Sequence, residues 1–246
     1  LFNYDIYHFE WGLDFYRDCR FAIELSKRNK PIICTYHGQD MRTRGVIKEL
    51  DQISDLNLTS EVDLLAKHPS IEYLFLPYNT AYYDINGSIS DPIKVCHSPT
   101  NRYYKGSEDI IKVCNELERE GVIQFLLIEK KPQEEVIRIK ETCDIYIDQI
   151  HNRGGWGYGM SSIESLSMGL VCMTEMIDEY GKFIPDHPFI DVNKNTLRKK
   201  ITQLSKNKEI LMQKKIESKE WVKKYHDIES VCSSLYSYYE KNSWMK

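Results

Sequence analysis

The fold is decided by GGWGYGMSSIESLSMG, residues 154–169. Two short apolar runs flank it, CDIYIDQI at 143–150 and LVCM at 170–173, and both predict buried strands. The glycines predict a turn, and the periodic segment behind them predicts a helix that ends at Gly169. Because glycines let the backbone approach a ligand and helix N-termini attract anions, the segment predicts a phosphate site.

Glu164 within this stretch has two interpretations. Ser161 and Glu164 have the spacing of a capping box, and spacing alone favours a helix that caps itself. The carboxylate could instead accept hydrogen bonds from a sugar diol while backbone N–H groups hold phosphates, an arrangement that suits a nucleotide. As a cap, Glu164→Gln should be nearly silent, and as a diol ligand it should weaken nucleotide binding with little change in thermal stability.

Composition indicates an ordinary globular chain. Its 246 residues are 41% hydrophobic and 28% charged, which fits one large domain or two small ones. A net charge of −4 gives no general attraction to nucleic acid or to anionic membranes. No apolar run approaches the roughly 18–20 residues that span a bilayer. Because the chain opens on Leu1, we expect a fragment or a processed product.

The seven cysteines are scattered and odd in number, without a CxxC pair or a Cys/His cluster. This spacing favours neither zinc nor a disulfide framework. We therefore expect no metal and no cofactor, and we interpret the cysteines as small buried hydrophobic residues in a reducing compartment.

The N-terminal part reads as a βαβ unit. An alternating strand is expected at 4–9, a helix at 14–28 and an almost wholly apolar strand at 31–36. HGQDMR (37–42) follows that strand directly, at the edge where α/β proteins bind ligands. His37 is therefore either a hydrogen-bonded loop residue or a functional one, and Asp40 and Arg42 are expected to pair with each other.

The second part alternates strands and helices again. Strands are expected at 93–97, 122–128, 143–150 and 170–173, with helices between them, which predicts a doubly wound parallel sheet. Arg102 and Lys105 flank the start of the helix at 107–120. They form either a solvated basic turn or a diphosphate clamp, because two cations beside a helix N-terminus add to its dipole.

Domain limits follow from the linker signal at Asn86-Gly87. We expect an N-terminal Rossmann-like lobe at 1–85 and a C-terminal Rossmann-like lobe at 86–225. The helical pattern at 195–222 is expected to break near Lys206, and a terminal helix within 226–246 is expected to pack back on the lobes.

Three motifs resemble those of family 4-like glycosyltransferases with the GT-B fold. DPIKVCHSPTNRYYKG (91–106) resembles the first strand and phosphate loop of their C-terminal domain, and residues 143–169 look like their donor-binding segment. TYHGQDMR (35–42) is similar to the H-G-S-D-x-R stretch of a polysaccharide-biosynthesis branch. The resemblance covers most of residues 4–173.

The resemblance implies an α/β, GT-B-like fold of two Rossmann-like lobes and a hexosyltransferase-type glycosyltransferase. It makes 1–85 a partial, acceptor-side lobe and 86–225 the nucleotide-sugar-binding lobe. Arg102 and Lys105 would hold the donor diphosphate, Glu164 the ribose hydroxyls, and His37 would face the donor sugar. Further donor-binding positions are Asn101, Gly157, Tyr158, Gly159, Met160 and Ser161. Acceptor-side or loop positions are Gly38, Asp40 and Arg42.

The reaction that the resemblance implies is retaining and metal-independent. Charge develops on the leaving diphosphate, where Arg102, Lys105 and the backbone near Ser161 would stabilise it. The expected partners are a UDP-, GDP- or ADP-type donor and a glycan or lipid-linked acceptor, with no nucleic acid. The resemblance implies a cytoplasmic protein and allows peripheral association with the inner face of the membrane.

Two departures favour an alternative, a non-catalytic nucleotide-sugar-binding module or subunit. The family often carries a Glu-x7-Glu pair, and here Trp156 stands at its first position. Family N-terminal domains also have several more strands before the one at Asp5, so we expect an incomplete lobe that a partner chain could complete.

Overall fold

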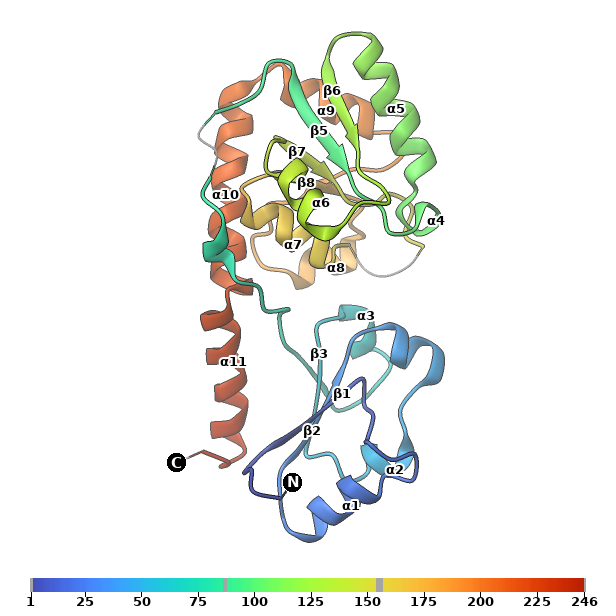
Figure 1. The fold of residues 1–246 in the computed structure, drawn as a ribbon, viewed down its shortest axis with the longest axis vertical. Coiled ribbons are helices and arrows are strands. Elements are labelled where there is room, and N and C mark those ends of the chain that lie inside the picture. The colour runs from blue at the N-terminus through green and yellow to red at the C-terminus, as the bar shows by residue number, and fades with distance from the viewer. Residues whose placement is uncertain (1, 86–87, 154–156, 246) are drawn as a thin grey trace. The chain divides into compact units, whose positions relative to one another are not determined.

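The computed structural model describes residues 2–85, 88–153 and 157–245. The chain forms two compact units, Leu1–Leu76 with Glu229–Lys246 and Pro77–Ile228 (Figure 1). Each unit is built around a parallel sheet, so the expected α/β class with two Rossmann-like units is confirmed. Among the helices of the described ranges, none is both long and apolar enough to cross a membrane.

The first unit holds a sheet in the order β1-β2-β3-β4, and all neighbouring strands run parallel. The strands are β1 (Tyr7–Glu10), β2 (Ile32–Tyr36), β3 (Leu56–Thr59) and β4 (Ile71–Tyr73). The helices are α1 (Arg20–Lys27), α2 (Lys48–Asp51), α3 (Val62–Leu65), the π-helical turn Asp40–Arg44 and most of α11 (Ile228–Lys241).

Strand β2 is apolar along its length because both of its faces are covered. Ile32 and Cys34 pack in a cluster with Leu25 of α1, whereas Ile33 packs in another cluster with Tyr239 of α11. Successive side chains of a strand point to opposite faces, so alternate residues meet different helices. The C-terminal helix thus completes the first unit.

The second unit holds a parallel sheet in the order β6-β5-β7-β8-β9 (Figure 1). Its strands are β5 (Ile93–His97), β6 (Ile123–Leu127), β7 (Ile145–Ile147), β8 (Val171–Thr174) and β9 (Ile190–Asp191). Its helices are η2 (Thr80–Tyr82, a 3-10 turn), α4 (Arg102–Lys105), α5 (Ser107–Arg119), α6 (Gln133–Lys140), α7 (Met160–Ser167), α8 (Asp178–Phe183), α9 (Leu197–Ser205) and α10 (Lys208–His226). The chain runs from β5 outward to β6 and then returns to the other side of β5, so the strand order reverses beside β5. In open α/β sheets, ligands bind at the carboxyl ends of the strands at such a switch point.

The limits of the units differ from those expected at residues 85 and 226. The segment after Pro77 joins the second unit, because the Tyr78 N–H donates to the His226 carbonyl at 2.7 Å and Lys219 donates to the carbonyls of Thr80 and Tyr83. The chain returns to the first unit at Glu229. The linker expected at Asn86-Gly87 lies outside the described residues.

The helical break expected near Lys206 is confirmed. Helix α9 ends at Ser205, and Asn207 caps α10 by accepting a hydrogen bond from the Ile210 N–H at 3.0 Å. The cysteines are all free thiols, and all but Cys232 are buried, in agreement with their interpretation as small core residues.

A buried ion pair fastens α10 to the sheet of the second unit. Lys215 Nζ lies 3.3 Å from Asp144 Oδ1, and the two side chains are 0% and 2% exposed. Asp144 also accepts the Lys94 N–H at 3.0 Å, so its charge is shared between a lysine and the backbone of β5. Removal of either partner from an ion pair this deep should lower the stability markedly.

His97 ties three elements together at the end of β5. Its Nδ1 lies 2.8 Å from the Ile147 carbonyl of β7 and its Nε2 lies 2.8 Å from Ser107 Oγ of α5. Because a carbonyl can only accept, Nδ1 carries the proton and Nε2 accepts from the Ser107 hydroxyl. Burial lowers the pKa of His97 to about 4 and so keeps the ring neutral.

The low pKa of His97 predicts a loss of stability in acid. Below about pH 6.5, His97 binds a proton in the unfolded chain but stays neutral in the folded one. The free energy of unfolding therefore falls as the pH drops from about 6.5 towards about 4. The full loss is about 3 kcal/mol. Urea unfolding of the wild type and His97→Gln at several pH values measures it, and an equal pH slope in both proteins would contradict the prediction.

Candidate functional site

A cavity of about 630 Å³ lies in the second unit at the switch point of the sheet. Its walls come from the segments that follow β5 and β6, from α6 and from the first turns of α7. The lining residues are Ser98, Pro99, Thr100, Arg102, Ile128, Glu129, Lys130, Lys131, Gln133, Val136, Lys140, Met160, Ser161 and Glu164. The cavity therefore occupies the edge where the strand order predicts a ligand.

The capping box expected for Ser161 and Glu164 is wrong. Helix α7 begins at Met160, and the extended residue Gly159 stands at its N-cap without a side-chain hydrogen bond. Ser161 is thus already inside the helix, and Glu164 is its fifth residue, two positions beyond the one from which a side chain closes a capping box. Ser161 Oγ instead contacts Tyr146 Oη at 2.8 Å and Lys140 Nζ at 2.7 Å.

Glu164 is held from two sides by α6. Lys140 Nζ donates to its Oε1 at 2.7 Å, and Gln133 Nε2 donates to its Oε2 at 2.8 Å. The Glu164 side chain is 7% exposed and that of Lys140 is 1% exposed, whereas Gln133 is exposed at the cavity edge. The floor of the cavity is therefore a buried ion pair, and its carboxylate keeps unused lone pairs on both oxygens.

Lys140 and Gln133 were not among the residues expected at the site. They are seven residues apart, two helical turns, which places them on the same face of α6. That spacing was the available signal, but it does not reveal which distant carboxylate the face meets.

Arg102 lines the same cavity from a segment that precedes α7 by more than 50 residues in the sequence. Asn101 caps α4 by accepting the Tyr103 N–H at 3.0 Å, so the expected donor-binding residue Asn101 fixes the start of this helix. The Arg102 guanidinium then pairs with Glu129 through two hydrogen bonds of 2.7 and 2.5 Å. These bonds hold the pKa of Glu129 below its usual range. The Arg102 side chain is 53% exposed, so the pair is available for exchange with a ligand.

Lys105 forms an ion pair with the buried Asp148, which follows β7. Its Nζ donates to Asp148 Oδ1 at 2.5 Å, and it is not among the residues that line the cavity described above. Burial alone raises the pKa of Asp148, but the charge of Lys105 and hydrogen bonds from Lys105 and Ser162 outweigh it, so the pKa is lowered. Of the two cations expected to clamp a diphosphate, the structure brings only Arg102 to the cavity wall.

The glycines of the turn have separate roles. Gly157 has φ +34°, and a Cβ there would overlap the Met176 sulfur, so the position requires glycine. A Cβ at Gly159 would meet no atom within 4 Å. The backbone at Gly159 is thus open on that side, as a loop that a ligand approaches would be.

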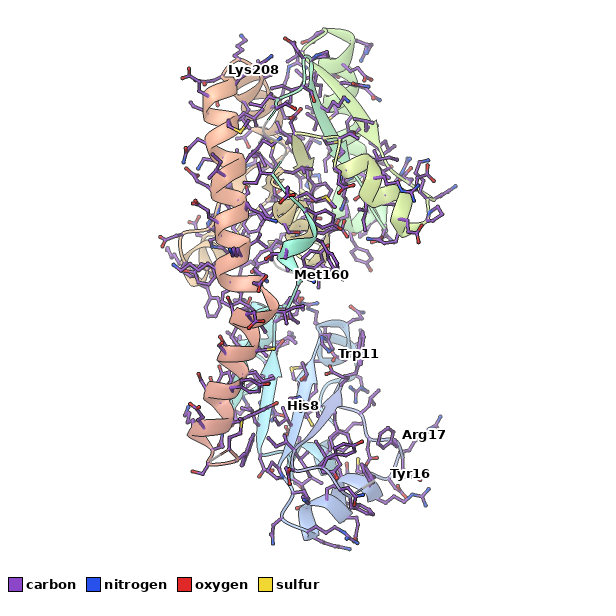
Figure 2. All side chains as sticks on the ribbon, turned by 60° about the vertical axis from the view of Figure 1, so that its left-hand side comes forward. His8, Trp11, Tyr16, Arg17, Met160 and Lys208 are labelled. Atoms are coloured by element: carbon purple, nitrogen blue, oxygen red, sulfur yellow. The ribbon has the colours of Figure 1, made fainter. Side chains whose placement is uncertain are left out.

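The two side chains next to these glycines diverge. Tyr158 is buried, with its ring centroid 4.7 Å from that of Phe189 and its hydroxyl 3.1 Å from His226 Nε2. Tyr158 therefore packs into an aromatic cluster and does not line the cavity. Met160, labelled in Figure 2, is exposed and does line it. Trp156 lies outside the described residues.

The expected pair of Asp40 and Arg42 in the first unit is wrong. Asp40 accepts the backbone N–H groups of His37 at 2.9 Å and Met41 at 2.8 Å, which fixes the turn after β2. Arg42 reaches across to the segment after β3, where it contacts Asp63 and Glu61 at 2.5 Å each. The hydrogen bonds that Arg42 donates to Asp63 and then to Glu61 raise the pKa of Arg42, and this double pairing outcompetes Asp40.

Gly38 is required by that arrangement. It has φ +109°, and a Cβ there would overlap the Arg42 guanidinium. His37 lies at the carboxyl end of β2, with Nε2 2.5 Å from Glu10 Oε2 and its ring 5.3 Å from that of Trp11. Glu10 and Trp11 end β1 and were not expected at a site. His37 is therefore at the ligand edge of the first sheet, as predicted, within a cluster that only the folded unit reveals.

Within residues 2–85, 88–153 and 157–245, no three His, Cys, Asp or Glu side chains come together in an arrangement that could hold a metal ion.

Comparison with known proteins places the fold. No protein-family model matches the chain, and no curated protein matches it in sequence. Among solved structures it resembles HepE from Anabaena in complex with UDP (TM-score 0.65, 10% identity, 90% of this chain and 75% of HepE covered). It also resembles sucrose-phosphate synthase from Thermosynechococcus elongatus (TM-score 0.65, 10% identity, 97% and 73% covered). A third resemblance is to a TarM variant from S. aureus in complex with fondaparinux, α-GlcNAc-glycerol and UDP (TM-score 0.62, 13% identity, 84% and 50% covered).

The chain therefore has the α/β fold of GT-B glycosyltransferases, with parallel sheets in two Rossmann-like units. At these identities the comparison concerns the fold.

The buried ion pair changes what substitution of Glu164 should do. Glu164→Gln leaves the Lys140 ammonium buried without a counter-charge, so we expect a loss of about 3–5 kcal/mol in the free energy of unfolding. The double variant Lys140→Met/Glu164→Gln removes both charges and should lose much less. Urea unfolding of both variants measures the difference, and a wild-type stability for Glu164→Gln would indicate that the pair contributes nothing.

Proposed function

We propose that the protein is a glycosyltransferase that binds the nucleotide part of a sugar donor in the cavity of the second unit. The observation that supports this most directly is that two complementary side chains line the same cavity. Arg102 supplies an exposed guanidinium suited to a diphosphate, and Glu164 supplies a carboxylate suited to a ribose diol. Both lie at the switch point of a parallel sheet, beside the N-terminus of α7.

The ligands of the similar structures support the choice of nucleotide. HepE is in complex with UDP, with UDP and glucose, and with UDP-glucose, and the TarM variant with UDP. We therefore propose a UDP-type donor as the first to test, ahead of GDP and ADP types. The acceptor that the resemblance favours is a glycan or a lipid-linked sugar, and the family that it favours is the family 4-like polysaccharide-biosynthesis type.

In the proposed reaction, the bond between the sugar and the donor phosphate breaks and negative charge develops on the leaving diphosphate. Arg102 would stabilise this charge after exchanging Glu129 for phosphate oxygens, and the dipole of α7 would add to it. Lys105 would join them on leaving Asp148. His37 is assigned to the donor sugar from the family resemblance, together with retention of configuration and independence from metal.

Two measurements on the full chain test the proposal. Calorimetric titration with UDP reports binding, and release of UDP from UDP-glucose, with and without a glycan acceptor, reports turnover. Binding together with release supports a transferase. Binding without release supports the alternative of a non-catalytic module, and the absence of binding to UDP, GDP and ADP contradicts the proposal.

Arg102→Ala should weaken UDP binding by about 1.5–3 kcal/mol, because it removes a charge-assisted contact to the diphosphate. Arg198→Ala is the matched control: Arg198 makes two 2.6 Å hydrogen bonds to Glu120, is 43% exposed and lies outside the cavity lining. It should leave UDP affinity unchanged. Arg102 tests the site more cleanly than Lys105, whose loss would also leave the buried Asp148 unpaired.

Glu129→Gln should have the opposite effect on UDP binding. It removes the anion that holds Arg102 and that would repel a phosphate in the same cavity, so affinity should rise. Calorimetry at fixed ionic strength measures it, since screening alters such interactions. A fall in affinity would show that Glu129 contacts the nucleotide favourably.

Donor binding should be insensitive to a chelator. In the proposed site, cationic side chains and a helix dipole neutralise the diphosphate, so EDTA should leave the UDP titration unchanged. A titration in which EDTA abolishes binding, and added Mg²⁺ restores it, would replace this mechanism with a metal-dependent one.

A further inference from the structure

Lys140 is the most enclosed charge on the cavity wall. It is the last residue of α6, and its Nζ lies 2.7 Å from both Glu164 Oε1 and Ser161 Oγ. The ammonium also sits 4.5 Å from the centroid of the Tyr146 ring. Two hydrogen bonds and the facing ring surround the ammonium, so we expect Lys140 to act on a ligand through these neighbours.

The second unit contains another lysine of the same kind away from the cavity. Lys215 pairs with Asp144 at 3.3 Å, and both side chains are as deeply buried as those of Lys140 and Glu164. Neither Lys215 nor Asp144 lines the cavity. Besides each other, Lys215 contacts the Ser88 carbonyl and Asp144 accepts the Lys94 N–H. The two pairs share the same burial and chemistry, but only one presents its carboxylate to the cavity.

The contacts of Glu164 differ between its two oxygens. Oε1 is fixed by the buried Lys140, whereas Oε2 is held only by Gln133, which is exposed at the cavity edge. A ligand can displace an exposed amide more easily than a buried ammonium. Without Lys140, Oε1 would lose the contact that fixes it, and the carboxylate would be free to change its orientation.

We propose that Lys140 is a positioning residue for sugar recognition: it holds the Glu164 carboxylate in a fixed orientation, so that the cavity selects a ribonucleotide over its 2′-deoxy counterpart. Gln133 yields its place on Oε2 to the ribose hydroxyl. This inference rests on the proposed function, because it assumes that the cavity binds the nucleoside part of the donor.

The test is a ratio of affinities measured by calorimetry. UDP, ADP and GDP are each compared with the corresponding 2′-deoxynucleoside diphosphate on the same protein. For wild type we expect at least one ribonucleotide to bind about tenfold or more tightly than its deoxy form, the value of a charge-assisted hydrogen bond. For Lys140→Met the ratio should fall towards one.

The ratio separates positioning from stability. Both ligands bind the same folded molecules, so a smaller folded fraction cancels in the ratio. Lys215→Met is the matched control: it breaks a buried pair of equal depth and should keep the wild-type ratio even where its thermal stability drops. Lys140→Gln, which keeps an amide donor near Ser161 but no charge, is measured in parallel and stands in where Lys140→Met does not fold.

A double variant tests the route of the effect. If Lys140 acts through Glu164, then Lys140→Met/Glu164→Gln should discriminate no less than Glu164→Gln alone. A wild-type ratio retained in Lys140→Met and Lys140→Gln would overturn the role of Lys140 and leave the proposed function standing. Failure of the wild type to bind any of the three ribonucleotides would overturn both.

Discussion

Parallel strands all present their carboxyl ends at the same edge of a sheet, and this constraint organises each unit of the protein. In the second unit it gathers the segments after β5 and β6 around one cavity, although some 30 residues separate them. In the first unit it places the ends of β1 and β2 together, which brings Glu10 and Trp11 to His37. Helices must cover both faces of such sheets, so the polar groups collect at their edges.

The second unit contains several buried charges at or near this edge. Lys140–Glu164, Lys105–Asp148 and Lys215–Asp144 each bury at least one carboxylate almost completely. Buried pairs often contribute little net stability compared with apolar residues of the same size, but the removal of one partner is costly. Such pairs are therefore weak evidence for stability alone. Two of the three lie near the candidate site: Lys140–Glu164 lines the cavity, and Lys105 ends α4 next to it. A fixed charge at these places could act on a bound ligand.

Arg102, Lys105 and Glu164 of the candidate site each have partners within the protein. Glu129 satisfies Arg102 as a phosphate would, and Gln133 satisfies Glu164 as a hydroxyl would. Both partners come from the segment between β6 and the first turn of α6. A nucleotide would have to exchange these contacts for its own, so the net affinity depends on the difference between two similar sets of hydrogen bonds.

Much of the fold follows from local patterns in the sequence. The apolar runs at 31–36, 93–97 and 143–150 contain the strands β2, β5 and β7, and the helical break near Lys206 was readable from periodicity. The helix behind the glycines and the position of His37 at a strand end were predicted too. These features depend on residues a few positions apart, where side-chain direction and backbone preference suffice.

Only the tertiary structure decided which charges meet. Glu164 pairs with Lys140, 24 residues away, and Arg42 with Asp63, 21 residues away, where spacing had suggested a capping box and a local pair. It also assigned α11 to the first sheet, because Tyr239 packs with Ile33 there. Long side chains reach any complementary group that folding brings near, and burial raises the energy of leaving a charge unpaired. The sequence determined the elements and the edge at which ligands bind, and folding determined the partners at that edge.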